Sequence, residues 1–190
     1  MSVLRTALLI CALALALPAA AQETAPPAPE EQLPPGDLYE ALAAAESPVE
    51  ARIIEQGIYA EWAHTESPSV GLIAEQAGAL LGEGDLKRSR EKLTALTEVA
   101  PDFAEGWRLR AVIHRKQGDF PAAVSDLRRV LEIEPRHFLA LVLLASIFED
   151  MEQYKPALKA WEAALEINPH LEGGAQTVRR LTDKVKGRGI

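Results

Sequence analysis

The sequence has 190 residues, which is enough for one ordinary domain and a tail, and its 48% apolar and 25% charged residues are typical of a globular protein. The net charge is −8 at pH 7, and residues 22–66 contain ten acidic side chains but only one base, Arg52. Nucleic acids and anionic lipid surfaces bind basic faces, so this charge distribution argues against both as partners.

Residues 1–21 have the layout of a secretory signal peptide: Arg5, then an apolar run, then small residues. We expect cleavage after Ala21 and no integral membrane span afterwards, because the apolar run is shorter than the roughly 20 residues that cross a bilayer. An uncleaved anchor is the alternative. The only cysteine, Cys11, leaves with the signal. An exported chain without disulfides fits a bacterial periplasm better than a small extracellular toxin or hormone, so we assign the protein to the periplasm.

Residues 22–36 are rich in proline and offer little to bury, so we expect a disordered, extended linker there. After it helix-forming residues dominate, and no stretch alternates with the two-residue period of a strand. In the next segment, 37–66, one helix begins at Asp37 and another at Ser47, where Glu50 completes a capping box. We interpret 37–66 as an N-terminal helical cap or a degenerate repeat.

From residue 67 the chain repeats with a period of 34 residues, and Pro101, Pro135 and Pro169 each end an apolar helical segment. Such a period predicts helix pairs that stack on one another and need a polar closing helix. We divide the repeats into 67–100, 101–134 and 135–169, followed by a closing helix at 170–186 and a tail at 187–190. The aligned pairs that define the period include Phe120 with Tyr154, Ala123 with Ala157, and Leu127 with Trp161.

These three repeats resemble tetratricopeptide repeats. The resemblance rests on a bulky residue, a small residue four positions later and a tight turn, with Glu152 replacing glycine in the third turn. It implies an all-α, right-handed α-solenoid of antiparallel helix pairs with capping helices. The phrases APDFAEGW and PRHFLAL also resemble small secreted proteobacterial members. The residues concerned are Ile73, Trp107 and Leu141, then Ala77, Ala111 and Ala145, then Gly84 and Gly118.

No pattern in the sequence indicates catalysis or a bound metal. The four histidines lack the spacing of metal ligands on one helix face, and no cysteine remains after cleavage. Glycine-rich phosphate loops, nucleophile elbows and zinc motifs are missing from the sequence. We therefore expect a non-enzymatic protein without metal or cofactor.

The resemblance implies a concave groove lined by the first helix of each repeat, where a protein or peptide partner binds. Small residues of the first repeat leave room, bases of the second attract a carboxylate, and apolar residues of the third hold a side chain. The alternative is a solvated face on which the arginines pair with neighbouring acids. The candidate binding residues are Ala74, Gly78, Arg108, Val112, Arg115, Lys116, Leu139, Val142, Ser146 and Glu149.

We therefore interpret the protein as a non-catalytic periplasmic scaffold for protein–protein interaction. One alternative is an accessory subunit of an envelope-assembly or secretion complex. Another is weak self-association, in which the acidic residues 22–66 of one copy meet the basic C-terminal residues 171–190 of another. A regulator or small-ligand sensor would need an enclosed polar pocket. Some relatives clamp a peptide carboxylate with lysines and asparagines in the groove; the only asparagine here is Asn168, in a turn, so we do not expect that mode.

Overall fold

The computed structural model describes residues 36–187, which form helices and connecting turns without a strand in that range. The predicted signal peptide at 1–21 and nearly all of the predicted linker lie outside the described residues. The helices are α1 (Leu38–Ala44), α2 (Pro48–Ala63), α3 (Pro68–Glu83), α4 (Leu86–Val99), α5 (Ala104–Lys116), α6 (Phe120–Ile133), α7 (Phe138–Asp150), α8 (Tyr154–Ile167) and α9 (Gly174–Gly187).

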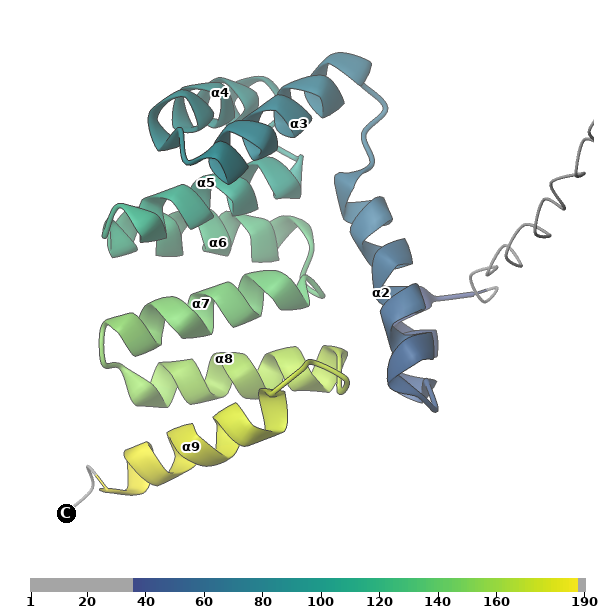
Figure 1. The fold of residues 1–190 in the computed structure, drawn as a ribbon, viewed down its shortest axis with the longest axis vertical. Helices are drawn as coiled ribbons and strands as arrows, with labels where there is room; N and C mark the ends of the chain where they lie inside the picture. Colours follow the sequence, from purple (N-terminus) through teal and green to yellow (C-terminus); the bar gives the residue numbers. More distant parts are fainter. Residues whose placement is uncertain (1–35, 188–190) are drawn as a thin grey trace, which may run out of the picture. The chain divides into compact units, whose positions relative to one another are not determined.

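Helices α3 to α8 pack as three antiparallel pairs, α3 with α4, α5 with α6 and α7 with α8, layered in chain order (Figure 1). The all-α, tetratricopeptide-like fold expected from the sequence is therefore confirmed. The small residues expected at the close contacts are fully buried: Ala77, Ala111, Ala145, Ala123 and Ala157. Helix axes can approach closely only where bulk is missing, so these alanines set the spacing of each pair.

Local signals begin and end these helices where the sequence predicts. Ser47 Oγ accepts a hydrogen bond from Glu50 N at 3.1 Å, while the Glu50 carboxylate accepts one from Glu46 N. The turns inside the pairs need a left-handed residue, with φ of 84° at Gly84 and 75° at Gly118. Glu152 occupies the third such turn at φ 56°. The repeat geometry therefore holds even where glycine is replaced.

Ser89 stands where the repeat pattern expects alanine. Its side chain is fully buried, and its hydroxyl donates a 2.7 Å hydrogen bond to the Ala77 carbonyl oxygen. A buried hydroxyl is costly only when it lacks a partner. The bond to α3 therefore lets serine replace alanine at the contact between α3 and α4.

Helices α1 and α2 form an apolar cluster with the third repeat. Figure 1 shows α2 running across the layered helices rather than along them. Its buried residues Ile54 and Ile58 share an apolar cluster with Phe138 of α7 and Ala164 of α8. The apolar cluster of the first repeat draws its residues from α3, α4 and α5 and the turn between α4 and α5. The apolar stripe of segment 37–66 thus packs on the third repeat.

Two polar contacts fix that position. Arg136, in the turn before α7, forms an ion pair with Asp37 at 2.7 Å. Asn168, in the turn after α8, is buried and donates a 2.6 Å hydrogen bond to Glu55 of α2. At the C-terminal end of the stack, α9 packs on α8, and its Leu181 is fully buried.

Candidate functional site

The predicted groove residues lie on the first helices of the three pairs, and the structure separates them into buried, covered and open positions. On α3, Ala74 is buried in the core of the first repeat. Gly78 is half-buried, and a Cβ built on it would meet nothing within 4 Å. Of these two positions, only Gly78 therefore borders open space.

Arg108, at the start of α5, is held by an acidic neighbour in the same helix. Its guanidinium donates two hydrogen bonds to Glu105, one of them from Nε at 2.7 Å. The two side chains are only 21% and 17% exposed. Burial lowers the pKa of Arg108, but the bonds to Glu105 outweigh it and raise that pKa overall. The positive charge of Arg108 is therefore neutralised inside the chain.

His137 lies under this pair and begins α7. Its Nδ1 accepts a hydrogen bond from Ala140 N at 3.3 Å, so the proton of the neutral ring is on Nε2, 3.8 Å from Glu105 Oε2. The ring is fully buried and stacks on Trp62 of α2, with 3.7 Å between ring centroids. Burial lowers the pKa of His137 below its usual 6.5. The imidazole is therefore neutral at pH 7.

Helix α2 covers the start of α7. Leu139 and Val142, two candidate binding residues, pack on the apolar cluster that contains Ile54 and Ile58. Burial raises the pKa of Tyr59, on α2, to about 12. The nearby positive charge of Arg108 acts in the opposite direction and lowers that pKa by a smaller amount, which places Tyr59 close to Arg108. The chain itself thus occupies the half of the predicted groove that begins at Arg108.

The other half is open, between the ends of α5 and α7. A hollow of about 310 Å³ is lined there by the candidates Val112, Arg115 and Lys116, together with Phe120, Leu143 and Asp150. Arg115 Nε donates to Asp150 Oδ2 at 2.8 Å, and both side chains are more than a third exposed. Lys116 is exposed and has no acidic partner within residues 36–187. The hollow therefore combines apolar walls with one uncompensated positive charge.

The last two candidates, Ser146 and Glu149, lie on α7 outside that lining. Ser146 Oγ donates a 3.0 Å hydrogen bond to the Val142 carbonyl oxygen of its own helix. Glu149 forms a 2.7 Å ion pair with Arg180 of α9. The closing helix thus holds Glu149, which leaves Asp150 as the acid beside the hollow.

Comparison with known protein families decides what kind of chain this is. A family model described as tetratricopeptide repeat matches residues 75–138 and 113–172, which together are more than half of the sequence. The chain belongs to the tetratricopeptide repeat family. A TPR repeat-containing protein of Rhizobium etli is 32% identical over 169 residues, which cover 87% of this chain and 80% of that protein.

Solved structures of tetratricopeptide domains share the fold. The first TPR domain of Spaghetti (RPAP3), bound to the HSP90 peptide SRMEEVD, matches with a TM-score of 0.60 and 16% identity, over 65% of this chain and 98% of that one. The Yersinia enterocolitica type III secretion chaperone SycD, in complex with a peptide of the translocator YopD, matches with a TM-score of 0.55 and 10% identity, over 64% and 93%. At such identities the likeness shows the fold alone.

Neither a metal centre nor a membrane span is present in the described part of this tetratricopeptide protein. Within residues 36–187, no group of three or more histidine, cysteine, aspartate or glutamate side chains is placed to hold a metal ion. None of the helices in the same range is long and apolar enough to cross a bilayer. The side chains that line the hollow offer apolar contact and ion pairing.

Sequence reasoning missed Phe120 as part of the hollow and α2 as the cover of the groove. Phe120 begins the second helix of its repeat, whereas the family resemblance implies a groove lined by the first helices. The signal for Phe120 is the tight turn at Gly118, which begins just after Lys116 and brings the start of α6 back beside the end of α5. For α2, Trp62 and Tyr59 on one helix face were the available signal, because aromatic side chains seek a surface to cover.

Proposed function

We propose that this protein is a non-catalytic periplasmic scaffold that binds a segment of another protein in the open half of its concave groove. Three lines of support exist. Members of the tetratricopeptide repeat family typically bind proteins or peptides, the two structural neighbours described above contain bound peptides, and the N-terminal sequence resembles an export signal. The hollow lined by Val112, Leu143 and Lys116 is the observation on which the proposal rests.

The apolar walls determine the first requirement on the ligand. Val112 of α5 and Leu143 of α7 face the hollow together with Phe120. These three side chains are only half-buried, so a ligand side chain that enters removes their remaining apolar surface from water. A leucine, methionine or phenylalanine of the partner fits this requirement.

The charges determine the second requirement. Lys116 has no acidic partner in the described residues, whereas Arg115 already binds Asp150 at 2.8 Å. A carboxylate of the ligand therefore meets Lys116 first and competes with Asp150 for Arg115. The bound segment is expected to carry an aspartate or glutamate next to its apolar anchor.

The two halves of the groove also determine the length of the ligand. Helix α2 covers Leu139 and Val142, and Arg108 is neutralised by Glu105. A segment bound in the open half therefore contacts the ends of α5 and α7 and does not continue along the whole groove. The partner is expected to present a short segment rather than one that spans all three repeats.

Site-directed photocrosslinking in the native host tests this function. A photoreactive phenylalanine replaces Val112 in the hollow or, as a control, Leu72, which is 54% exposed on α3. We expect a defined partner to be crosslinked from position 112 and not from position 72. Lys116→Glu is expected to reduce that crosslinking at least about fivefold, since it turns an attractive contact into a repulsive one.

The matched charge control is Lys87→Glu, because Lys87 is exposed on α4, away from the residues that line the hollow. Its crosslinking from position 112 should equal that of the unmodified chain. Equal capture from positions 112 and 72, or equal losses in the two lysine variants, would show that the open half of the groove is not the binding site.

A further inference from the structure

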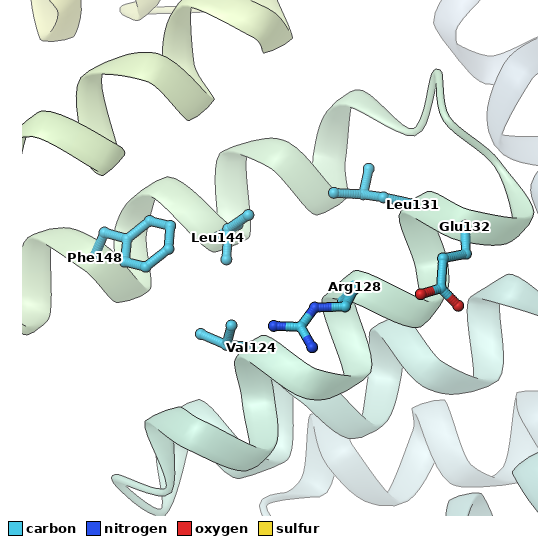
Figure 2. A pocket seen from close by; sticks show the side chains of 6 residues that line it. All are labelled: Val124, Arg128, Leu131, Glu132, Leu144 and Phe148. Atoms are coloured by element: carbon cyan, nitrogen blue, oxygen red, sulfur yellow. The ribbon is translucent and has the colours of Figure 1, made fainter.

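A second groove lies between α6 and α7 and does not include the predicted site residues. Figure 2 shows its lining: Val124, Arg128, Leu131 and Glu132 from α6 face Leu144 and Phe148 from α7. The hollow has a volume of about 350 Å³. It continues into a neighbouring hollow of about 390 Å³ that shares Val124, Arg128 and Phe148. The two hollows form one continuous apolar groove, which we call the α6/α7 groove.

The walls of the α6/α7 groove are two parallel rows of side chains. Val124, Arg128 and Leu131 are four and three residues apart and share one face of α6, while Leu144 and Phe148 are four apart on α7. Val124, Leu131, Leu144 and Phe148 are each only half-buried. Two helices set side by side offer a trough of the kind into which a ridge of a third helix packs.

The charge in the groove is not balanced. Glu132 is the acid in the lining, but it already forms an ion pair with Arg129 at 3.3 Å, and Arg129 also binds Asp102 at 2.9 Å. Arg128 is exposed and has no acidic partner within residues 36–187. An uncompensated guanidinium beside apolar side chains is complementary to a carboxylate, which accepts its parallel N–H donors.

The backbone of the walls excludes one mode of recognition. The N–H and C=O groups of α6 and α7 are used inside the helices, so an extended peptide finds no strand edge with which to pair. A helical ligand satisfies its own backbone and presents apolar side chains at positions i, i+4 and i+7. From these observations we infer that the α6/α7 groove binds an acidic amphipathic helix of a partner protein, with a carboxylate on Arg128.

A pair of synthetic helical peptides tests this inference with the full-length chain. Each is a capped alanine-based helix with leucines at i, i+4 and i+7, and position i+3 is glutamate in one peptide and lysine in the other. Titrations followed by amide chemical shifts report where and how tightly each peptide binds. We expect the glutamate peptide to shift amides of α6 and α7 around Val124, Arg128 and Phe148, and to bind at least about fivefold more tightly than its lysine twin.

Charge exchange makes the test specific. In the variant Arg128→Glu the preference should reverse, so that the lysine peptide binds more tightly. Arg128 is exposed, so this substitution leaves the packing of α6 intact. Arg128→Gln should remove the preference without reversing it. Lys87→Glu, exposed on α4 and outside the lining of both the α6/α7 groove and the concave hollow, is the matched control and should change neither peptide's affinity.

The results that would overturn the inference are equally defined. Binding that does not depend on the charge at residue 128 would show that Arg128 does not select the ligand. Shifts confined to Val112 and Leu143 would place the helix in the concave hollow instead. Absence of binding by either peptide would show that the apolar walls do not accept a helix.

Discussion

The two ends of α5 have charged residues of the same kind in opposite surroundings. At its start, Arg108 and Glu105 are largely buried beside His137 and under α2. At its end, Arg115 pairs with Asp150 of α7, and both remain partly exposed beside an open hollow. We call these the covered end and the open end. Arg108 and Arg115 lie on the same stripe of α5, so the repeat pattern does not explain their different exposure. The helix α2, which crosses the covered end, does.

The difference teaches how a repeat protein limits its own groove. Stacked helix pairs produce the same stripe at each layer, which gives a long and uniform surface. Here α2 packs on Phe138, Leu139 and Val142 and removes that part of the surface from solvent. The part of the surface that stays open to solvent is then set by where the coverage by α2 ends.

The largest expected effect comes from removing the anchor of α2 at the covered end. Phe138 is fully buried and lies in the cluster that joins α1 and α2 to α7. Phe138→Ala is expected to lower the free energy of unfolding by about 3–5 kcal/mol, since it removes a large side chain from a packed core. Urea denaturation measures this loss. Leu72→Ala, at an exposed position, should change it by less than about 0.5 kcal/mol.

Trp62 fluorescence shows whether the loss comes from the covered end. It stacks on His137 at 3.7 Å and donates a 2.9 Å hydrogen bond to Tyr39, so undocking of α2 exposes its indole. We expect a red-shifted emission of Trp62 in Phe138→Ala, recorded with Trp107 and Trp161 replaced by phenylalanine. An unchanged emission together with an unchanged denaturation midpoint would contradict the arrangement of α2.

The second prediction concerns the ion pair at the covered end. Glu105→Gln keeps the shape of the side chain but leaves Arg108, which is only 21% exposed, without a counter-charge. We expect the free energy of unfolding to fall by about 1–3 kcal/mol, the usual loss when a buried polar group loses its partner. Thermal and urea unfolding of the variant measure it. A loss near zero would mean that water reaches Arg108 and that α2 does not cover it.

Most of the fold follows from local sequence signals, as particular residues show. Asp37 and Ser47 each accept a backbone hydrogen bond at the start of a helix, where the sequence predicts that a helix begins. The 34-residue period predicts which alanines are buried in each pair. These features depend on neighbours within one or two turns, which is why a single sequence reveals them.

The position of α2 does not follow from such signals. An apolar stripe like that of Ile54 and Ile58 shows that one helix face is buried, but not against which surface. The contacts that decide it join distant parts of the chain, such as Asp37 with Arg136 and Trp62 with His137. The candidate site was therefore predictable as a stripe, whereas its division into a covered end and an open end required the three-dimensional arrangement.

The third prediction uses the pKa of His137 to distinguish the two ends. Burial holds this pKa below 6.5, while the unfolded chain has an ordinary histidine. Below pH 6.5 the unfolded state binds a proton that the folded state does not, so stability falls as the pH is lowered towards the folded pKa. The slope reaches at most about 1.4 kcal/mol per pH unit for one group.

Urea denaturation between pH 7 and pH 5 measures this slope. His137→Asn is the control, because its side-chain oxygen still accepts a hydrogen bond at the start of α7 but does not titrate. The pH-dependent contribution of Glu105 to stability falls in a lower pH range than that of His137. Although burial raises its pKa, the bond from Arg108 outweighs this and lowers that pKa below 4.5, so its contribution is lost only under more acidic conditions. Equal slopes for the two chains would show that His137 is not held neutral by the covered end.

The smallest expected effect is at the open end. Asp150→Asn breaks the ion pair with Arg115. The side chains of Arg115 and Asp150 are 36% and 40% exposed, so we expect the free energy of unfolding to fall by less than about 1 kcal/mol. Salt sharpens the contrast, because a Debye length of about 3 Å at 1 M screens an exposed pair and acts much less on a buried one. High salt should therefore erase the stability loss of Asp150→Asn but preserve that of Glu105→Gln. Urea unfolding at low and at high salt measures both losses. If salt erased both effects equally, Glu105 and Arg108 would be as accessible to solvent as the open end, and α2 would not limit the groove.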